Sequence, residues 1–222
     1  MSSNDSRRLA RRGFLSRLSA SAAGLTVYAG APSRVRSALA PFTVGEIDPD
    51  AWIDRLRGTD RTLFHAHERI LPALGGARNV LVNGRNAYGL AESDNAVAVA
   101  THGPAIGGLL RSEVWDRYNL GEVYKVVDPR TGAPSRRNVY LEPQDGAPSD
   151  VSVPALMDRG VLFLVCNVAL RNLSKRIAQD LEADAIHHEL LAGLVPGTIV
   201  VPDLFVAMSR AQKKGVSYIF VD

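Results

Sequence analysis

The chain of 222 residues contains a single cysteine, Cys166. One cysteine excludes an intramolecular disulfide, a C-x-x-C redox motif and a zinc site built on paired cysteines. Long hydrophobic runs are also missing, because the weakly apolar stretch at residues 18–31 is too short and too polar for a stable membrane span. The sequence therefore predicts no such span. It leaves Cys166 as a free thiol, an intermolecular partner or a buried small hydrophobe.

The excess of positive charge is confined to the first forty residues. The whole chain has a net charge of +3 and a pI of about 9.2, values that invite a nucleic-acid-binding interpretation. However, residues 1–40 hold seven arginines and one acid, Asp5, and removing this +6 leaves −3 for residues 41–222. A mildly acidic body does not favour contacts with a phosphate backbone, so we expect no nucleic-acid partner.

The basic leader has its own pattern. Residues 10–16, Ala-Arg-Arg-Gly-Phe-Leu-Ser, resemble the twin-arginine export motif, and a stretch rich in Ala, Ser and Gly follows. Small residues at Ala31 and Ala40 offer two cleavage sites, each followed by proline. We expect residues 1–40 to form an export signal and tether, residues 41–222 to form one folded domain, and the mature protein to reach a bacterial periplasm.

Strand-like and helix-like segments alternate through the domain. Apolar or β-branched runs predict five strands, and residues 72–89 predict a helix because Leu74, Ala77, Leu81, Gly84 and Tyr88 recur at helical spacing. The predicted strands cover residues 61–67, 96–101, 161–165, 198–201 and 216–221; further helices are expected at 50–56, 107–118, 151–159, 168–179, 182–192 and 203–214. This alternation predicts an α/β fold: a three-layer α/β/α sandwich with a mostly parallel five-stranded sheet.

Residues 119–150 interrupt the alternation. They are rich in Gly, Pro, Asp and Arg, without periodicity, and we expect an inserted loop. A loop of this length in a compact domain is commonly a lid, an oligomer contact or a disordered segment.

Three predicted strands end on side chains that can do chemistry. His65 and His67 end the first, His102 follows the second, and Cys166 and Asn167 follow the third. Ligands of open parallel sheets bind at the carboxyl ends of the strands, and a thiol at the start of a helix is favoured as thiolate. If the three strands are neighbours, His102 can serve as general base and acid beside Cys166.

Each of these residues also has a structural interpretation. Cys166 can be a packing residue, and His65 and His67 lie two apart, on one face of a regular strand that can turn toward a helix layer. The three histidines at residues 65, 67 and 102 can alternatively supply nitrogen ligands to zinc or copper, although no metal-ligand spacing motif is present. His187 and His188 fall within a predicted helix, where a solvated face is the expected environment.

Five motifs give the chain a resemblance to the DsrE/DsrF-like sulfur-relay family. They are Ala87-Tyr88-Gly89, Val165-Cys166-Asn167 with Ala169-Leu170, Leu194–Pro202, Arg210-Ala211-Gln212 and Gly215–Ile219. The resemblance covers roughly residues 50–222 and implies an α/β/α fold, homo- or hetero-oligomers, and a cysteine that carries persulfide sulfur at the position of Cys166. The family members known as relays work in the cytoplasm with partner proteins and lack the 119–150 insertion.

The leading hypothesis from the sequence is an exported DsrE-like protein that accepts sulfane sulfur on Cys166 and passes it to a partner. Cys166 and His102 are the predicted catalytic residues, and Asn167, His65 and His67 are predicted to bind. We expect no cofactor and no metal. We expect the protein to form a homo-oligomer. The alternative is a non-catalytic oligomeric module that binds a small ligand while Cys166 stays buried.

Overall fold

The computed structural model describes residues 48–178 and 182–222. These residues belong to one compact unit, and the export signal predicted for residues 1–40 lies outside them. Five strands form one sheet in the order β4-β3-β2-β1-β5, and every neighbouring pair is parallel. The strands are β1 (Asp60–Ala66), β2 (Asn95–Thr101), β3 (Leu162–Cys166), β4 (Ile199–Val201) and β5 (Ser217–Val221). The predicted parallel five-stranded sheet is confirmed.

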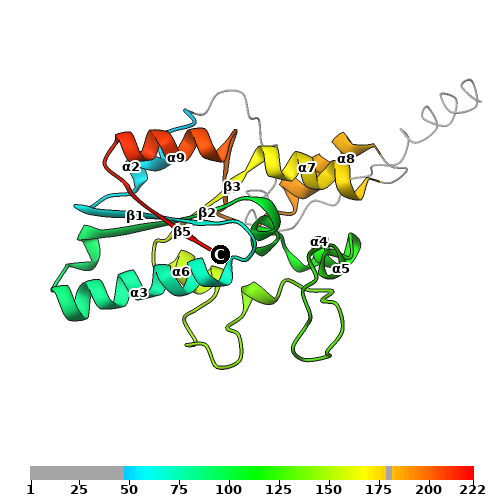
Figure 1. Cartoon of the computed structure of the whole chain (residues 1–222), viewed down its shortest axis with the longest axis horizontal. Helices are drawn as coiled ribbons and strands as arrows, with labels where there is room; N and C mark the ends of the chain where they lie inside the picture. The colour runs from blue at the N-terminus through cyan, green and yellow to red at the C-terminus, as the bar shows by residue number, and fades with distance from the viewer. Residues whose placement is uncertain (1–47, 179–181) are drawn as a thin grey trace, which may run out of the picture. The chain divides into compact units, whose positions relative to one another are not determined.

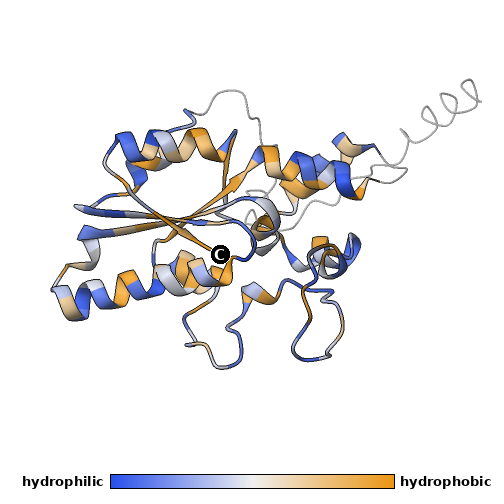
Figure 2. Cartoon of the chain, in the orientation of Figure 1, coloured by the Kyte–Doolittle hydropathy of each residue, from blue (hydrophilic) through white to orange (hydrophobic). Residues whose placement is uncertain are grey.

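The interior strand β3, between β4 and β2, is buried on both faces. Phe163, Leu164 and Val165 are 0% exposed, and Figure 2 shows the strand in hydrophobic colours along its length. Strands covered by helices on both sides read as continuous apolar runs rather than as alternating ones. The run at residues 161–165 therefore marked this strand correctly.

The long helix α3 (Leu71–Tyr88) covers one face of the sheet, together with α6 (Val153–Asp158) (Figure 1). Its predicted seam is buried at Leu74, Ala77, Leu81 and Gly84. Glycine is required at the last of these positions, because a Cβ there would lie 2.4 Å from the Nδ2 atom of Asn95. The helical interpretation of residues 72–89 is confirmed.

Helices α2 (Ala51–Arg55) and α9 (Leu204–Lys213) cover the opposite face (Figure 1). An ion pair between Asp50 and Arg210 joins them. Helix α7 (Asn167–Ile177) follows β3 directly and packs on α8 (Ala183–Ala192). The domain is therefore a three-layer α/β/α sandwich.

The predicted helix over residues 107–118 is wrong in its first half. A 3-10 helix, η2 (Gly103–Leu109), ends before the extended residue Leu110, and α4 (Ser112–Arg117) begins after it. Leu110 forms an isolated antiparallel bridge with Leu194. A contact with a residue more than eighty positions away therefore overrides the local helical pattern.

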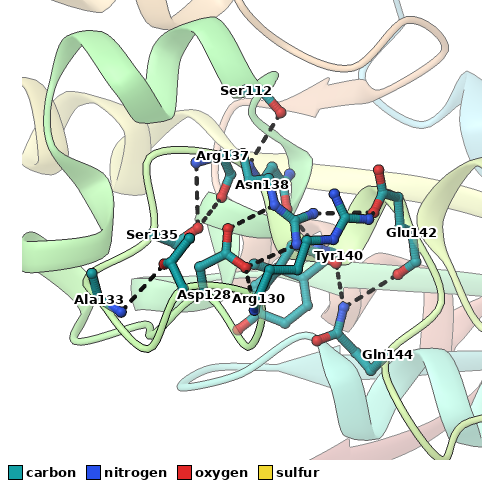
Figure 3. A network of polar contacts seen from close by, with 12 residues as sticks. Ser112, Asp128, Arg130, Ala133, Ser135, Arg137, Asn138, Tyr140, Glu142 and Gln144 are labelled. Carbon is teal, nitrogen blue, oxygen red and sulfur yellow. Dashed lines mark hydrogen bonds and ion pairs between the residues drawn. The ribbon is translucent and has the colours of Figure 1, made fainter.

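Polar contacts within the 119–150 segment hold it together, and a hydrogen bond from the amide of Asn138 to the hydroxyl of Ser112, at 3.2 Å, joins it to the body (Figure 3). It contains α5 (Leu120–Tyr124) and a 3-10 turn, η3 (Val139–Leu141). The buried Nδ2 of Asn138 donates to the carbonyl oxygens of Gly107, Gly108 and Leu110 at 3.3, 2.9 and 2.7 Å. The segment is mostly irregular, as predicted, but it is attached to the end of η2.

In the part of the chain that the structure describes, no helix combines the length and the apolar character needed to cross a membrane.

Candidate functional site

The strand order places three chemistry-bearing strand ends side by side. Strands β3, β2 and β1 are consecutive neighbours in the sheet. His67 and His102 follow the last paired residues of β1 and β2, Ala66 and Thr101, and the amide of His102 donates to the carbonyl of Ala66 at 3.0 Å. The condition on which the predicted site depended, that these strands be neighbours, is confirmed.

The three histidines form a cluster at this rim. The Nδ1 atoms of His67 and His102 lie 3.1 Å apart, and their rings stack with centroids separated by 5.2 Å. His65 is buried beside them, with its Nδ1 atom 2.9 Å from the hydroxyl of Tyr218. The ring of Phe205 on α9 contacts both His65 and His102, at centroid distances of 6.2 and 5.0 Å.

A cavity of about 170 Å³ opens next to His102. Its walls come from the start of η2, from α7 and from the 119–150 segment. The lining residues are His102, Gly103, Pro104, Ile106, Tyr124, Ala169, Asn172, Leu173 and Arg176. The cavity lies at the carboxyl end of β2, which is where open parallel sheets bind ligands.

The polar groups of this cavity differ in charge. The guanidinium of Arg176 lies 5.2 Å from the ring centroid of Tyr124, within cation–π range. Burial raises the pKa of Tyr124, so its phenol is a neutral hydrogen-bonding group. Burial, followed by the neighbouring His67, lowers the pKa of His102. At neutral pH Arg176 is therefore the charged group in the cavity wall.

Cys166 lies in the core and not in the wall of this cavity. Cys166 is 1% exposed. Its backbone occupies the N-cap position of α7, and its side chain makes no capping hydrogen bond. His65, Ala100 and Leu164 are aligned across β1, β2 and β3. Because side chains alternate along a strand, Cys166 lies on the same sheet face as His65.

Asn167 is turned toward α8. Its Oδ1 atom lies 2.8 Å from Nε2 of His187, which is 3% exposed. The solvated helix face predicted for His187 is therefore wrong, whereas His188 is exposed as predicted. Burial lowers the pKa of His187, and the charge of Arg171 adds to the effect.

The three rim histidines do not form a metal-ligand group. Within residues 48–178 and 182–222, no cluster of three or more His, Cys, Asp or Glu side chains has a geometry that could hold an ion.

Sequence reasoning missed most of the cavity wall. Ala169, Asn172, Leu173 and Arg176 recur at spacings of three and one along α7, which is a helix-face pattern that could have indicated them. Tyr124 belongs to the segment predicted as a loop, and no pattern in the sequence indicated its position.

No known family model matches this chain, and no curated protein matches it either. Among solved structures it is similar to MTH1491, a protein of unknown function from Methanobacterium thermoautotrophicum. The two share 19% identity over 73% of this chain and 99% of that one, with a TM-score of 0.39. This likeness assigns no activity to the chain.

Proposed function

We propose that this domain is a binding module for a small organic anion, held at the carboxyl end of the sheet between His102 and α7. The observation that carries the proposal is the cavity of about 170 Å³ with Arg176 in its wall. A single water needs about 10–15 Å³ of such space, so the cavity has room for a small ligand of several heavy atoms.

The wall has the composition that a short carboxylate needs. Arg176 and Asn172 offer N–H donors, and the neutral ring of His102 can donate or accept. Ile106 and Leu173 supply apolar surface. Guanidinium groups recognise carboxylates through charge-assisted, often bidentate hydrogen bonds, so Arg176 is the residue that selects for an anion.

The test is a titration with propionate, monitored by the NMR signals of the His102 ring. Arg176→Gln is expected to weaken binding about tenfold to a hundredfold, since a hydrogen bond to a charged group contributes about 1.5–3 kcal/mol. Arg171→Gln, which removes a charge from the same helix but not from the cavity wall, should leave the affinity unchanged. Equal weakening in both variants, or equal binding of neutral propionamide, would refute the proposal.

A second candidate function is sulfur relay by a DsrE-like protein, and one observation favours it. Cys166 occupies the N-cap position of α7. Val165 pairs with Thr101, and Cys166 and His102 are the next residues on the two neighbouring strands. In this scheme His102 accepts the thiol proton. The thiolate then attacks a terminal sulfur of trisulfide, which breaks one S–S bond, leaves a persulfide on Cys166 and releases disulfide dianion.

The two candidates differ in whether the thiol can be reached. Relay predicts that intact-mass spectrometry after polysulfide treatment shows a gain of sulfur that reductant reverses and that Cys166→Ser abolishes. A binding module predicts no gain, together with slow alkylation of Cys166, because the residue is 1% exposed. Val168→Cys in a Cys166→Ala background is a matched control, because Val168 is 41% exposed on the same helix.

We also propose that the protein is exported and self-associates. The export proposal rests on Arg11-Arg12, and replacing both with Lys should retain the protein in the cytoplasm. Self-association is supported by the edge strand β5, where Tyr218, Ile219 and Phe220 are 37%, 39% and 52% exposed. Phe220→Lys should lower the molar mass measured by light scattering; an unchanged mass would exclude this edge as the interface.

A further inference from the structure

A second and larger cavity, of about 670 Å³, lies on the other side of Pro104 and Tyr124. Small-molecule sites typically measure about 300–1,000 Å³, so this cavity has the size of a ligand site. Part of its wall comes from the 119–150 segment, through Val123, Tyr124, Lys125, Val126 and Tyr140. It takes no part in the binding proposed at His102.

Aromatic rings form one wall of this cavity. The ring of Trp115 lies 6.4 Å from that of Tyr124 and 6.3 Å from that of Tyr140, centroid to centroid. The Trp115 Nε1–H donates to the carbonyl of Gly107 at 2.9 Å, which fixes the orientation of the indole. Trp115 is itself fully buried and backs the partly exposed rings of Tyr124 and Tyr140. A planar aromatic ligand can stack on or meet the edges of these two tyrosine rings.

Two cations stand at the rim. Arg69 and Lys125 line the cavity with exposed side chains, and within residues 48–178 and 182–222 neither forms an ion pair. Burial raises the pKa of Tyr140, and the positive charge of Arg69 partly opposes this shift. The two side chains are therefore close enough to interact electrostatically. One anion, Glu68, also lines the cavity, with its Oε1 atom 3.3 Å from Nε2 of His67.

The end of α5 fixes the position of Lys125. Lys125 ends α5 in the left-handed region, with φ of 55° and ψ of 41°. Helices commonly end in this conformation, although glycine is the usual residue there. The helix terminus therefore places a cationic residue at the mouth of the cavity, where glycine would be the less strained choice.

We propose that this cavity binds an anionic ligand with a planar aromatic body. The aromatic wall contacts the planar part, and Arg69 and Lys125 attract the negative group at the rim. The proposal goes beyond anion binding at His102, because Arg176 and His102 do not line this cavity.

The probe that tests the proposal is 1-anilinonaphthalene-8-sulfonate, an aromatic anion whose fluorescence rises in apolar surroundings. We expect saturable binding to the folded chain that weakens with added salt. Arg69→Gln and Lys125→Gln should each weaken it two- to fivefold, which is about 0.4–1 kcal/mol and typical of an exposed charge pair. Glu68→Gln should strengthen it. The neutral analogue N-phenyl-1-naphthylamine should bind all these variants alike.

Matched controls and a blocking variant make the result decisive. Arg57→Gln and Lys213→Gln remove exposed cations that do not line the cavity, and should leave the affinity unchanged. Val126→Trp should reduce binding by filling the cavity. Equal effects of Arg57→Gln and Arg69→Gln would overturn the proposal, as would full binding to a folded Val126→Trp protein. Because propionate binding is measured separately, failure here leaves the site at His102 untouched.

Discussion

The Nδ1 atoms of His67 and His102 lie 3.1 Å apart, so one ring donates a hydrogen bond and the other accepts it. That arrangement needs one of the two Nδ1 atoms to carry no proton. Protonating both rings removes the acceptor and places two positive charges side by side. The pair therefore couples the state of the rim to pH.

We predict that the folded state loses stability as the pH falls through 6.5. Burial lowers the pKa of both His65 and His102 from the ordinary value of 6.5. The unfolded chain then binds more protons than the folded one, so the contribution of these rings is complete above pH 6.5 and is lost on acidification. Urea unfolding at pH 8 and pH 5.5 measures the effect. His102→Gln should reduce it in part, because the buried rings of His65 and His187 remain, and His188→Gln should leave it unchanged. A pH-independent midpoint in the native protein would contradict the prediction.

Asn138 should be among the costliest polar residues to remove. Its Nδ2 group donates to the carbonyls of Gly107, Gly108 and Leu110, and its Oδ1 atom accepts from the amide of Tyr140 (Figure 3). Asn138→Ala leaves the buried carbonyls of Gly108 and Leu110 without this donor, at about 1–3 kcal/mol each, whereas the Gly107 carbonyl keeps the Trp115 indole. We therefore expect a loss of about 3 kcal/mol or more in urea unfolding. Asn79→Ala, on an exposed face of α3, should stay within about 0.5 kcal/mol of wild type.

Lys125→Gly should stabilise the protein and weaken its binding of the aromatic anion. Glycine adopts a φ of 55° without the steric cost that a Cβ brings, which favours the folded state by about 1 kcal/mol. Lys175→Gly, in the last turn of α7, is a control of opposite sign and should cost up to about 1 kcal/mol. Thermal unfolding and dye titration of the same samples separate the two effects. Destabilisation by Lys125→Gly would show that the position carries no strain.

Asn167→Asp should raise the pKa of His187. The Oδ1 atom of Asn167 lies 2.8 Å from Nε2 of His187, and a carboxylate at that distance favours the protonated ring. In the native protein burial lowers this pKa, so the two titration curves should be clearly separated. An NMR pH titration of the ring protons measures it, with His188 as the exposed reference in the same spectra. An unchanged His187 curve would mean that the contact is not formed in solution.

Local patterns were enough for the architecture. The continuous apolar run before Cys166 and the seam of α3 depend on neighbours a few residues away, and both the strand and the helix lie where these patterns predicted them. The prediction failed at Leu110, which is extended because it pairs with Leu194. Periodicity carries no information about such a distant partner.

By itself the sequence determined the α/β/α class, the strands that end at His67, His102 and Cys166, and the thiol's place before α7. Only the tertiary structure decided that these strands are neighbours, that Cys166 is buried, and that Tyr124 and Arg176 complete a cavity beside His102. The physical reason is the distance along the chain over which the deciding interactions act. Strand and helix formation follow from side-chain periodicity within a segment, whereas strand order and burial follow from contacts between segments far apart in the chain.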